Sequence, residues 1–178
     1  FAAPVVINAA GGWADTMARL AGLEPLGIEP YRRTALTVEA PAGVDIENWP
    51  EMVDVDEEFY FKPDAGLILI SPADETPTRP VDAQPDEYDV AMGVHRFELA
   101  TGLDIRQVRA SWAGLRTFAP DRLFVAGFDP RAAGFFWLAG QGGYGVQSAP
   151  AMAKMAAFLV NGAEPEGDFG IVREHVED

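Results

Sequence analysis

The sequence contains no cysteine, which excludes disulfides, iron–sulfur clusters and zinc sites built on thiolates. Only two histidines are present, His95 and His175, and they lie too far apart in the sequence to suggest a metal site. No apolar run approaches the ~20 residues needed to cross a bilayer, and no signal peptide is recognisable. We therefore expect a cytoplasmic protein without a metal, with peripheral association with the inner membrane left open.

Basic residues are scarce. The chain has 28 acidic and 13 basic side chains among 178 residues, a net charge of −15, and only Lys62 and Lys154 are lysines. Such a charge disfavours nucleic acid as a partner, because phosphate binding needs a basic face. The acidity fits either a salt-adapted source or an ordinary acidic surface. Hydrophobic residues make up 48% of the chain, enough for a folded core and too many for a disordered chain.

The hydrophobic pattern predicts an α+β fold with a largely antiparallel sheet, about seven strands and three helices. The first predicted strand, expected to be buried and within residues 4–10, leads into Gly11 and Gly12, and it resembles the last strand of a sheet whose other strands are missing. In the helix that follows, Trp13, Met17 and Leu20 share one stripe, up to a stop at Gly22. The remaining predictions are a hairpin of 59–62 with 67–70, an irregular loop at 71–86, a helix at 86–100, and strands at 31–39, 105–118, 122–126 and 135–138.

Residues 140–145 hold four glycines in six positions, between the strand at 135–138 and a final helix that stops at Gly162. Glycines let a backbone approach a ligand closely, and a helix start offers free N–H groups and a positive dipole end. The segment suits a phosphate, a carboxylate or a ligand that gains negative charge, although by spacing alone a glycine-rich turn is more often a simple turn. We do not take it as a dinucleotide fingerprint, which is followed by an acid about 20 residues on, or as a P-loop.

Two arginine positions stand out. Arg116 ends the run Trp112-Ala113-Gly114-Leu115-Arg116. The guanidinium of an arginine can bind a carboxylate through two parallel hydrogen bonds. Arg32 and Arg33 are neighbours on a predicted strand, so only one of them can point inward. The alternative for each arginine is a surface charge.

Several of these segments resemble a known family. Residues 5–14, 112–116 and 140–145 are similar to the FAD-dependent D-amino acid oxidase superfamily, which includes glycine oxidase. Residues 59–66 and 134–137 look most like its D-arginine (broad D-amino acid) dehydrogenase branch, and the resemblance runs from about residue 4 to residue 160. It implies hydride transfer from the Cα atom of a D-amino acid to flavin N5, which yields an imino acid.

The resemblance also implies a domain division. Residues 1–28 would be the returning strand and helix of a Rossmann-like FAD domain, 29–118 the substrate domain, 119–162 the last FAD-domain strands and helix, and 163–178 an acidic tail. The Gly-x-Gly-x-x-Gly turn that grips the FAD pyrophosphate is expected in a part that this sequence lacks. We therefore expect the C-terminal half of a flavoenzyme, inactive alone. Its partner would be the missing N-terminal FAD-binding segment or chain, and its exposed apolar surface offers a route to a dimer.

By the same resemblance, Arg116 clamps the substrate carboxylate, Arg33 is a second arginine on the carboxylate side, and the Tyr60 hydroxyl donates to the same carboxylate. Val53 is a wall residue, and the Gly143 carbonyl receives the substrate amino group. No catalytic acid or base is assigned. Glu51 replaces an apolar wall residue and either adds affinity for a cationic substrate or sits at a loop edge. The residues implied to contact FAD are Gly11, Gly12, Gly140, Gln141, Gly142, Gly143, Tyr144 and Gly145.

Two other functions remain open from the residues: an inert scaffold half that binds only its complement, and a small-carboxylate-binding module without redox activity. His95 is expected at the surface or at a boundary, and His175 in solvent.

Overall fold

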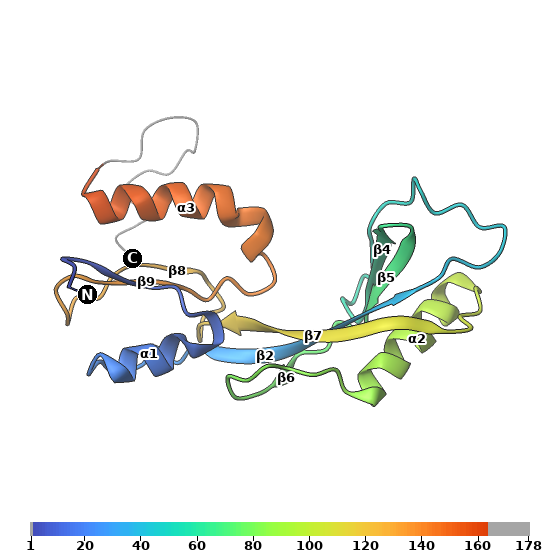
Figure 1. Ribbon diagram of the computed structural model, residues 1–178, viewed down its shortest axis with the longest axis horizontal. Coiled ribbons are helices and arrows are strands. Elements are labelled where there is room, and N and C mark those ends of the chain that lie inside the picture. The colour runs from blue at the N-terminus through green and yellow to red at the C-terminus, as the bar shows by residue number, and fades with distance from the viewer. Residues whose placement is uncertain (1, 164–178) are drawn as a thin grey trace. The chain divides into compact units, whose positions relative to one another are not determined.

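The computed structural model describes residues 2–163, and the chain divides into two compact units (Figure 1). Unit 1 comprises Phe1–Pro30 and Arg116–Asp178, and unit 2 comprises Tyr31–Leu115. Each unit is described by itself. The predicted acidic tail from residue 164 onward, with His175, lies outside the described residues. None of the helices within residues 2–163 is both long and apolar enough to span a bilayer.

Unit 1 is built on a three-stranded sheet in the order β1-β9-β8, in which β1 runs parallel and β8 antiparallel to β9. Figure 1 shows α1 and α3 on opposite faces of this sheet. Its elements are β1 (Val6–Asn8), a 3-10 turn η1 (Gly11–Trp13), α1 (Ala14–Leu20), β8 (Val125–Phe128), β9 (Phe135–Ala139) and α3 (Gly145–Asn161).

The helix α1 buries its small residues. Ala14 and Ala18 are fully buried and belong to one cluster with Phe135 and Trp137 of β9. The predicted stripe of large side chains exists, but it faces outward, with Met17 45% and Leu20 77% exposed. Alanines let a helix approach the broad aromatic rings of β9 closely, so the large side chains are left on the other face.

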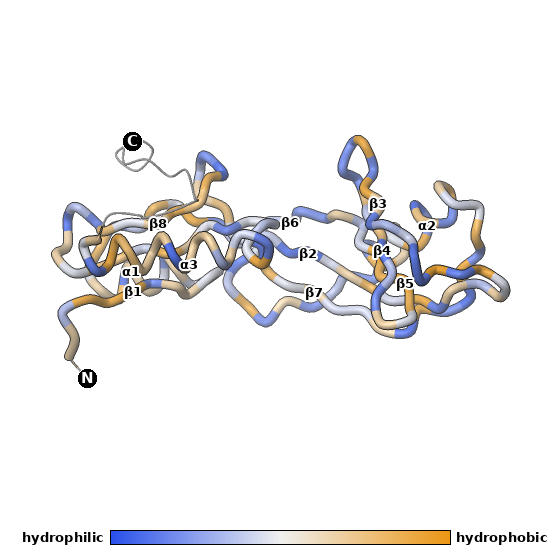
Figure 2. The backbone as a smooth tube through the Cα atoms, turned by 90° about the horizontal axis from the view of Figure 1, so that it is seen from above, coloured by the Kyte–Doolittle hydropathy of each residue, from blue (hydrophilic) through white to orange (hydrophobic). Residues whose placement is uncertain are grey.

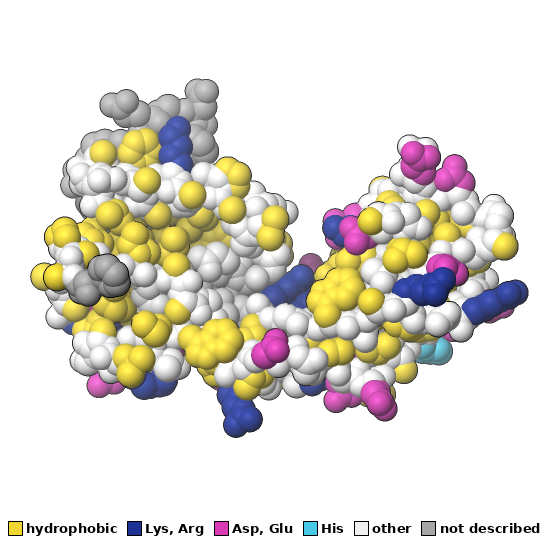
Figure 3. Space-filling model, viewed as in Figure 1, with side chains coloured by type: hydrophobic (Ala, Val, Ile, Leu, Met, Phe, Trp, Pro, Cys, Tyr) yellow, Lys and Arg dark blue, Asp and Glu magenta, His cyan; other side chains and the backbone are white. Residues whose placement is uncertain are grey.

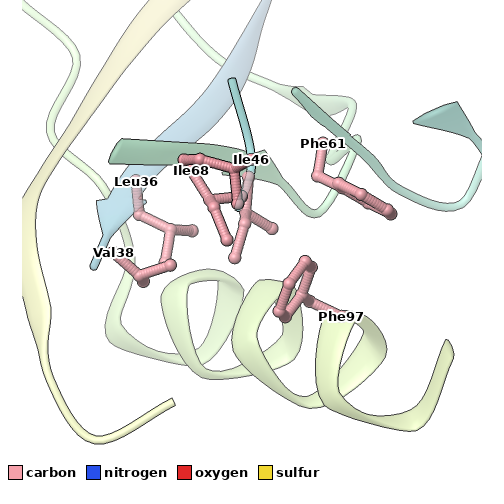
Figure 4. Packing of buried hydrophobic residues seen from close by; sticks show 7 residues of the cluster. Leu36, Val38, Ile46, Phe61, Ile68 and Phe97 are labelled. Atoms are coloured by element: carbon pink, nitrogen blue, oxygen red, sulfur yellow. The ribbon is translucent and has the colours of Figure 1, made fainter. Parts of the chain in front are cut away.

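Unit 2 contains a sheet in the order β3-β4-β5-β2-β6, with β7 also paired to β2. One face of this sheet packs on α2, where Leu36, Ile70 and Phe61 lie side by side in the strand register and Phe97 of the helix meets Phe61 edge-on at 5.0 Å (Figure 4). The elements are β2 (Glu29–Val38), β3 (Met52–Val53), β4 (Tyr60–Asp64), β5 (Leu67–Ser71), β6 (Thr76–Pro77), α2 (Glu87–Thr101) and β7 (Val108–Phe118).

The α+β prediction is confirmed, and so is the hairpin. Its strands are joined by Ala65 and Gly66, which both have positive φ (50° and 82°), as a tight hairpin turn requires. The helix predicted at 86–100 is α2: the Asp86 carboxylate accepts a hydrogen bond from Tyr88 N at 2.9 Å, and Gly102 ends the helix in the left-handed region.

Two predictions of extent were wrong. The strand expected at 122–126 begins only at Val125, because Arg122 closes a turn with a left-handed backbone (φ 64°) and a hydrogen bond to Ala119 O. The expected loop at 71–86 contains β6, one of two strands that are only two residues long. Strands that short have no period to detect in a sequence, and the described residues accordingly hold nine strands rather than seven.

Candidate substrate and flavin site

The end of β7 runs beside the glycine turn at 140–145. Gly142 N donates a hydrogen bond to Thr117 O at 2.8 Å. A Cβ atom added to Gly142 would lie 2.6 Å from the Phe118 ring, and one added to Gly143 would lie 2.8 Å from Arg116 Nη1. Side chains of this chain therefore occupy the space beside both glycines. The Phe118 ring packs against Gly142, and the Arg116 guanidinium packs against the backbone of Gly143.

Arg116 is half-buried, and among the described residues no carboxylate lies within 4 Å of it. Two other arginines are each paired with a carboxylate: Arg32 Nη2 lies 2.5 Å from Asp89, and Arg131 Nη2 lies 2.7 Å from Asp129. A half-buried guanidinium without an acid is unusual in a chain with 28 acids, because a desolvated charge needs a partner. The arrangement leaves Arg116 available to an external anion.

Acids are also absent from the surrounding sequence. Residues 1–14, 105–120 and 130–163 contain no aspartate or glutamate. On the face seen in Figure 3, the acidic side chains accordingly gather over unit 2. The 17-residue helix α3 starts at this turn with no side-chain cap and no acid in its first turn. Its positive dipole end and the Arg116 guanidinium together favour negative charge at the turn.

The glycine turn at Gly11 and Gly12 differs from the one at 140–145. Gly11 has positive φ (55°), and a Cβ atom added there would meet nothing within 4 Å, so this turn borders open space. Gly12 is buried. In the second turn, Gln141 is half-buried, Tyr144 is exposed, and a Cβ atom at Gly140 would lie 3.2 Å from Leu123 O.

In unit 2 the alternation of β2 separates the two adjacent arginines. Arg32 reaches Asp89 of α2, so Arg33 lies on the opposite face of the strand. Arg33 Nη2 lies 3.3 Å from Glu75 Oε1. A carboxylate that binds Arg33 would therefore compete with Glu75.

Tyr60 and Val53 are register partners on β4 and β3. Tyr60 is the neighbour of Phe61, whose side chain packs on α2, and side chains alternate between the two faces of a strand. Tyr60 and Val53 therefore lie on the sheet face opposite α2, the face that also carries Arg33. Tyr60 is half-buried, and Glu51 is exposed just before β3. Within unit 1 the structure thus brings together Arg116 and Gly143, and within unit 2 it places Arg33, Tyr60 and Val53 on one face.

The expectation that this sequence lacks a Gly-x-Gly-x-x-Gly run was wrong, since Gly140, Gly142 and Gly145 have that spacing. The local structure nevertheless differs from a dinucleotide-binding turn. The second glycine of that turn leaves space for the pyrophosphate, whereas the space beside Gly142 is taken by Phe118. No strand follows α3 within the described residues, so the required strand–helix–strand unit is not formed there.

Sequence reasoning missed two buried carboxylates that support the frame of unit 1. Asp15 in α1 accepts hydrogen bonds from Leu26 N, Gly27 N and Ile28 N at 3.0–3.1 Å. An acidic residue in the first turn of the short helix α1 was the available signal.

The second is Asp129, which accepts from Arg131 N, Nε and Nη2 and from Trp137 Nε1. The hydrogen bonds from the Arg131 side chain hold the pKa of Asp129 far below its ordinary value; burial opposes this, and the Trp137 indole adds to it. The run Asp129-Pro130-Arg131 is a recognisable turn sequence, but the indole partner is eight residues away and cannot be read from it.

The comparisons with known proteins agree with this architecture. The family model described as FAD dependent oxidoreductase (DAO) matches residues 1–159. Glycine oxidase of Pseudomonas aeruginosa is 30% identical over 166 residues, which cover 90% of this chain and 42% of that protein. The FAD-dependent oxidoreductase domain-containing protein 1 of Bos taurus is 25% identical over 172 residues, covering 88% of this chain and 35% of that protein.

Among solved structures, glycine oxidase from Geobacillus kaustophilus superposes with a TM-score of 0.77 at 26% identity, covering 96% of this chain and 45% of that one. L-proline dehydrogenase from P. horikoshii shares the fold, with a TM-score of 0.71 at 23% identity over 90% of this chain and 43% of its own. The chain thus spans between about a third and a half of the length of these relatives. It belongs to the DAO family of FAD-dependent oxidoreductases.

Proposed function

We propose that this chain is the part of a flavoenzyme that binds an amino acid substrate, a D-amino acid or glycine, by its carboxylate. The observation that carries the proposal is the Arg116 guanidinium, half-buried against Gly143 and without a carboxylate partner among the described residues. FAD, when bound, supplies the acceptor for the hydride that leaves the substrate Cα atom. The resulting imino acid is hydrolysed by water to a 2-oxo acid and ammonia.

The residues at the two turns fit a flavin. The turn at 140–145 and the uncapped start of α3 offer N–H groups and a positive dipole end to a ring system that becomes negative on reduction. Gly11 offers an open backbone for close approach. We assign FAD contact to Gly11, Gly12 and residues 140–145, and propose that Gly143 O accepts a hydrogen bond from the neutral amino group of the substrate, whose lone pair forms the C=N bond as the hydride leaves.

Three residues of unit 2 complete the proposed substrate contacts. Arg33 and the Tyr60 hydroxyl would donate to the carboxylate, and Val53 would form a wall beside them. Their common sheet face supports this assignment. The narrower proposal, a D-arginine-like substrate, rests on the sequence resemblance of residues 59–66 and 134–137 to that branch.

The proposal is tested by mixing the complete gene product, loaded with FAD and kept without oxygen, with glycine, a set of D-amino acids and their L-enantiomers. We expect glycine or D-amino acids to bleach the visible flavin absorbance, with release of ammonia. If FAD binds and neither glycine nor any D-amino acid bleaches it, the proposed function is wrong.

We further propose that a strand from additional polypeptide pairs with β1. This strand lies at the edge of its sheet, is largely hydrophobic (Figure 2), and leaves Val6 56% and Ile7 48% exposed, although strands in parallel pairing are normally covered on both sides. The relatives contain more than half of their length outside the matched region, which can supply such a strand.

Light scattering of the 178-residue chain across salt concentrations tests this pairing. We expect self-association that disappears in the complete gene product. A chain that stays monomeric at every salt concentration, or a dimer that persists in the complete product, contradicts the proposal.

A further inference from the structure

We propose that Arg122 is a positioning residue for the glycine turn. It holds the Phe118 ring against Gly142, and so fixes the backbone that seats Arg116. The inference rests on the proposed function of this turn in ligand binding, and it adds a residue that does not itself touch the ligand.

The contacts form a continuous series. The Arg122 guanidinium carbon lies 3.9 Å from the centroid of the Phe118 ring, within the range of a cation–π interaction. The ring is buried, and its Cε1 atom lies 2.6 Å from the position that a Cβ atom of residue 142 would take. The ring therefore lies directly against the Cα atom of Gly142, with the guanidinium packed on it.

The backbone of Arg122 points to a role for its side chain. Its φ of 64° lies in the left-handed region, where glycine or asparagine is favoured over a long side chain. The turn itself is already closed by backbone and Asx hydrogen bonds, from Arg122 N to Ala119 O at 2.8 Å and from Leu123 N to Asp121 Oδ1 at 2.9 Å. The turn thus uses only the backbone of Arg122, and a long side chain at a strained position is a reason to look for a function of that side chain.

The neighbouring contacts show what Phe118 would release if it moved. Gly142 N donates a hydrogen bond to the backbone oxygen of Thr117, which precedes Phe118 in the chain. Gly143, which follows Gly142, packs against the Arg116 guanidinium. A ring that rotates away from Gly142 loosens this peptide on one side. The substrate-binding arginine then loses its fixed support without losing any contact of its own with the ligand.

The test uses the complete gene product with FAD and three variants: Arg122→Gly, which removes both the strain and the cation, Arg122→Lys, which keeps the cation, and Phe118→Leu. Ala65→Gly is the matched control, because it relieves a left-handed alanine (φ 50°) in unit 2. Three quantities are measured: the melting temperature, the hydrogen exchange of a peptide that covers residues 140–145, and the dissociation constant for benzoate from the flavin spectrum.

We expect Arg122→Gly to keep or raise the melting temperature, as Ala65→Gly does, because glycine suits a positive φ. Exchange at 140–145 should nevertheless accelerate, and benzoate should bind about three- to tenfold more weakly, the range that corresponds to loss of a cation–π contact. Arg122→Lys should restore most of the binding, and Arg122→Gly should add nothing in the Phe118→Leu background.

Unchanged exchange and unchanged benzoate affinity in Arg122→Gly would overturn the inference, as would a full additional effect in the Phe118→Leu background. The two proposals fail separately. If benzoate does not bind even the wild type, carboxylate binding at Arg116 is refuted, whereas the exchange at 140–145 still decides whether Arg122 positions the turn.

Discussion

Replacing Gly143 by alanine should displace Arg116 while leaving the fold intact. The added Cβ atom would lie 2.8 Å from Arg116 Nη1 and 3.0 Å from Cζ, whereas ordinary contact begins at 3.4 Å. Gly143 is not among the glycines with positive φ, so alanine adds no backbone strain there. The guanidinium ends a flexible side chain, and it must therefore move by about 0.6 Å, the difference between the contact limit and the Nη1 distance.

A displacement on the order of 1 Å in a binding group can reduce activity about 100-fold. We therefore expect kcat/KM of Gly143→Ala for a D-amino acid to fall about 10- to 100-fold, mainly through a higher KM, because a carboxylate clamp binds the substrate in both the ground state and the transition state. The melting temperature should change little. The assay is steady-state dye reduction with the complete gene product, together with a thermal melt.

Gly114→Ala and Gly127→Ala are the matched controls, because a Cβ atom at either position meets nothing within 4 Å and neither residue has positive φ. Both should retain the wild-type KM. The reasoning is refuted if Gly143→Ala folds normally and keeps the wild-type KM, or if Gly114→Ala raises KM as much as Gly143→Ala does.

Three further variants test the frame around the site. In Gly142→Ala the added Cβ atom would lie 2.6 Å from the rigid Phe118 ring, at a residue with a φ of 53°. Urea titration should therefore show a free energy of unfolding lower by about 2–4 kcal/mol. An unfolding free energy equal to that of the wild type would contradict the packing described. Asp15→Ala leaves three N–H groups without their acceptor and should lower the free energy of unfolding by about 2–3 kcal/mol in the same titration, with Thr16→Ala as an exposed control. Asp129 has a depressed pKa in the folded state, so its contribution to stability is complete above pH ~4, the ordinary value, and is lost as the pH falls below it. The stability difference between wild type and Asp129→Asn should therefore shrink on acidification, and a difference that grows instead would show the opposite sign of the pKa shift.

Much of the local structure follows from the sequence, because the signals are carried by neighbouring residues. The helix α2 begins and ends where Asp86 and Gly102 place its caps. The hairpin of β4 and β5 follows from turn residues that accept positive φ at 65 and 66. Such elements need no knowledge of distant partners.

Other features depend on partners that are remote in the sequence. The exposed face of α1 follows from the aromatic rings of β9, more than a hundred residues away, and the two-residue strands β3 and β6 exist only because a longer strand pairs with each. The late start of β8 follows from the left-handed backbone of Arg122, which no propensity favours.

The candidate site shows the same division. Arg116 and the glycine turn stand out in the sequence because of their residue types and spacing. The reason for the glycines does not, since it depends on β7 bringing Arg116 and Phe118 against Gly143 and Gly142. The sequence indicated a backbone that approaches a ligand, whereas the structure shows a backbone that accommodates the side chains of Arg116 and Phe118.

The central claim is that Arg116 recognises the carboxylate of the substrate. It is tested most directly by comparing kcat/KM for D-alanine and for D-alaninol, which lacks the carboxylate, in wild type and in Arg116→Ala. Because truncating one partner of a desolvated charge pair costs about 2–5 kcal/mol, we predict that wild type prefers D-alanine by roughly 30-fold or more. In Arg116→Ala the preference should vanish through loss of D-alanine activity alone, and a variant that keeps the wild-type preference would contradict the claim.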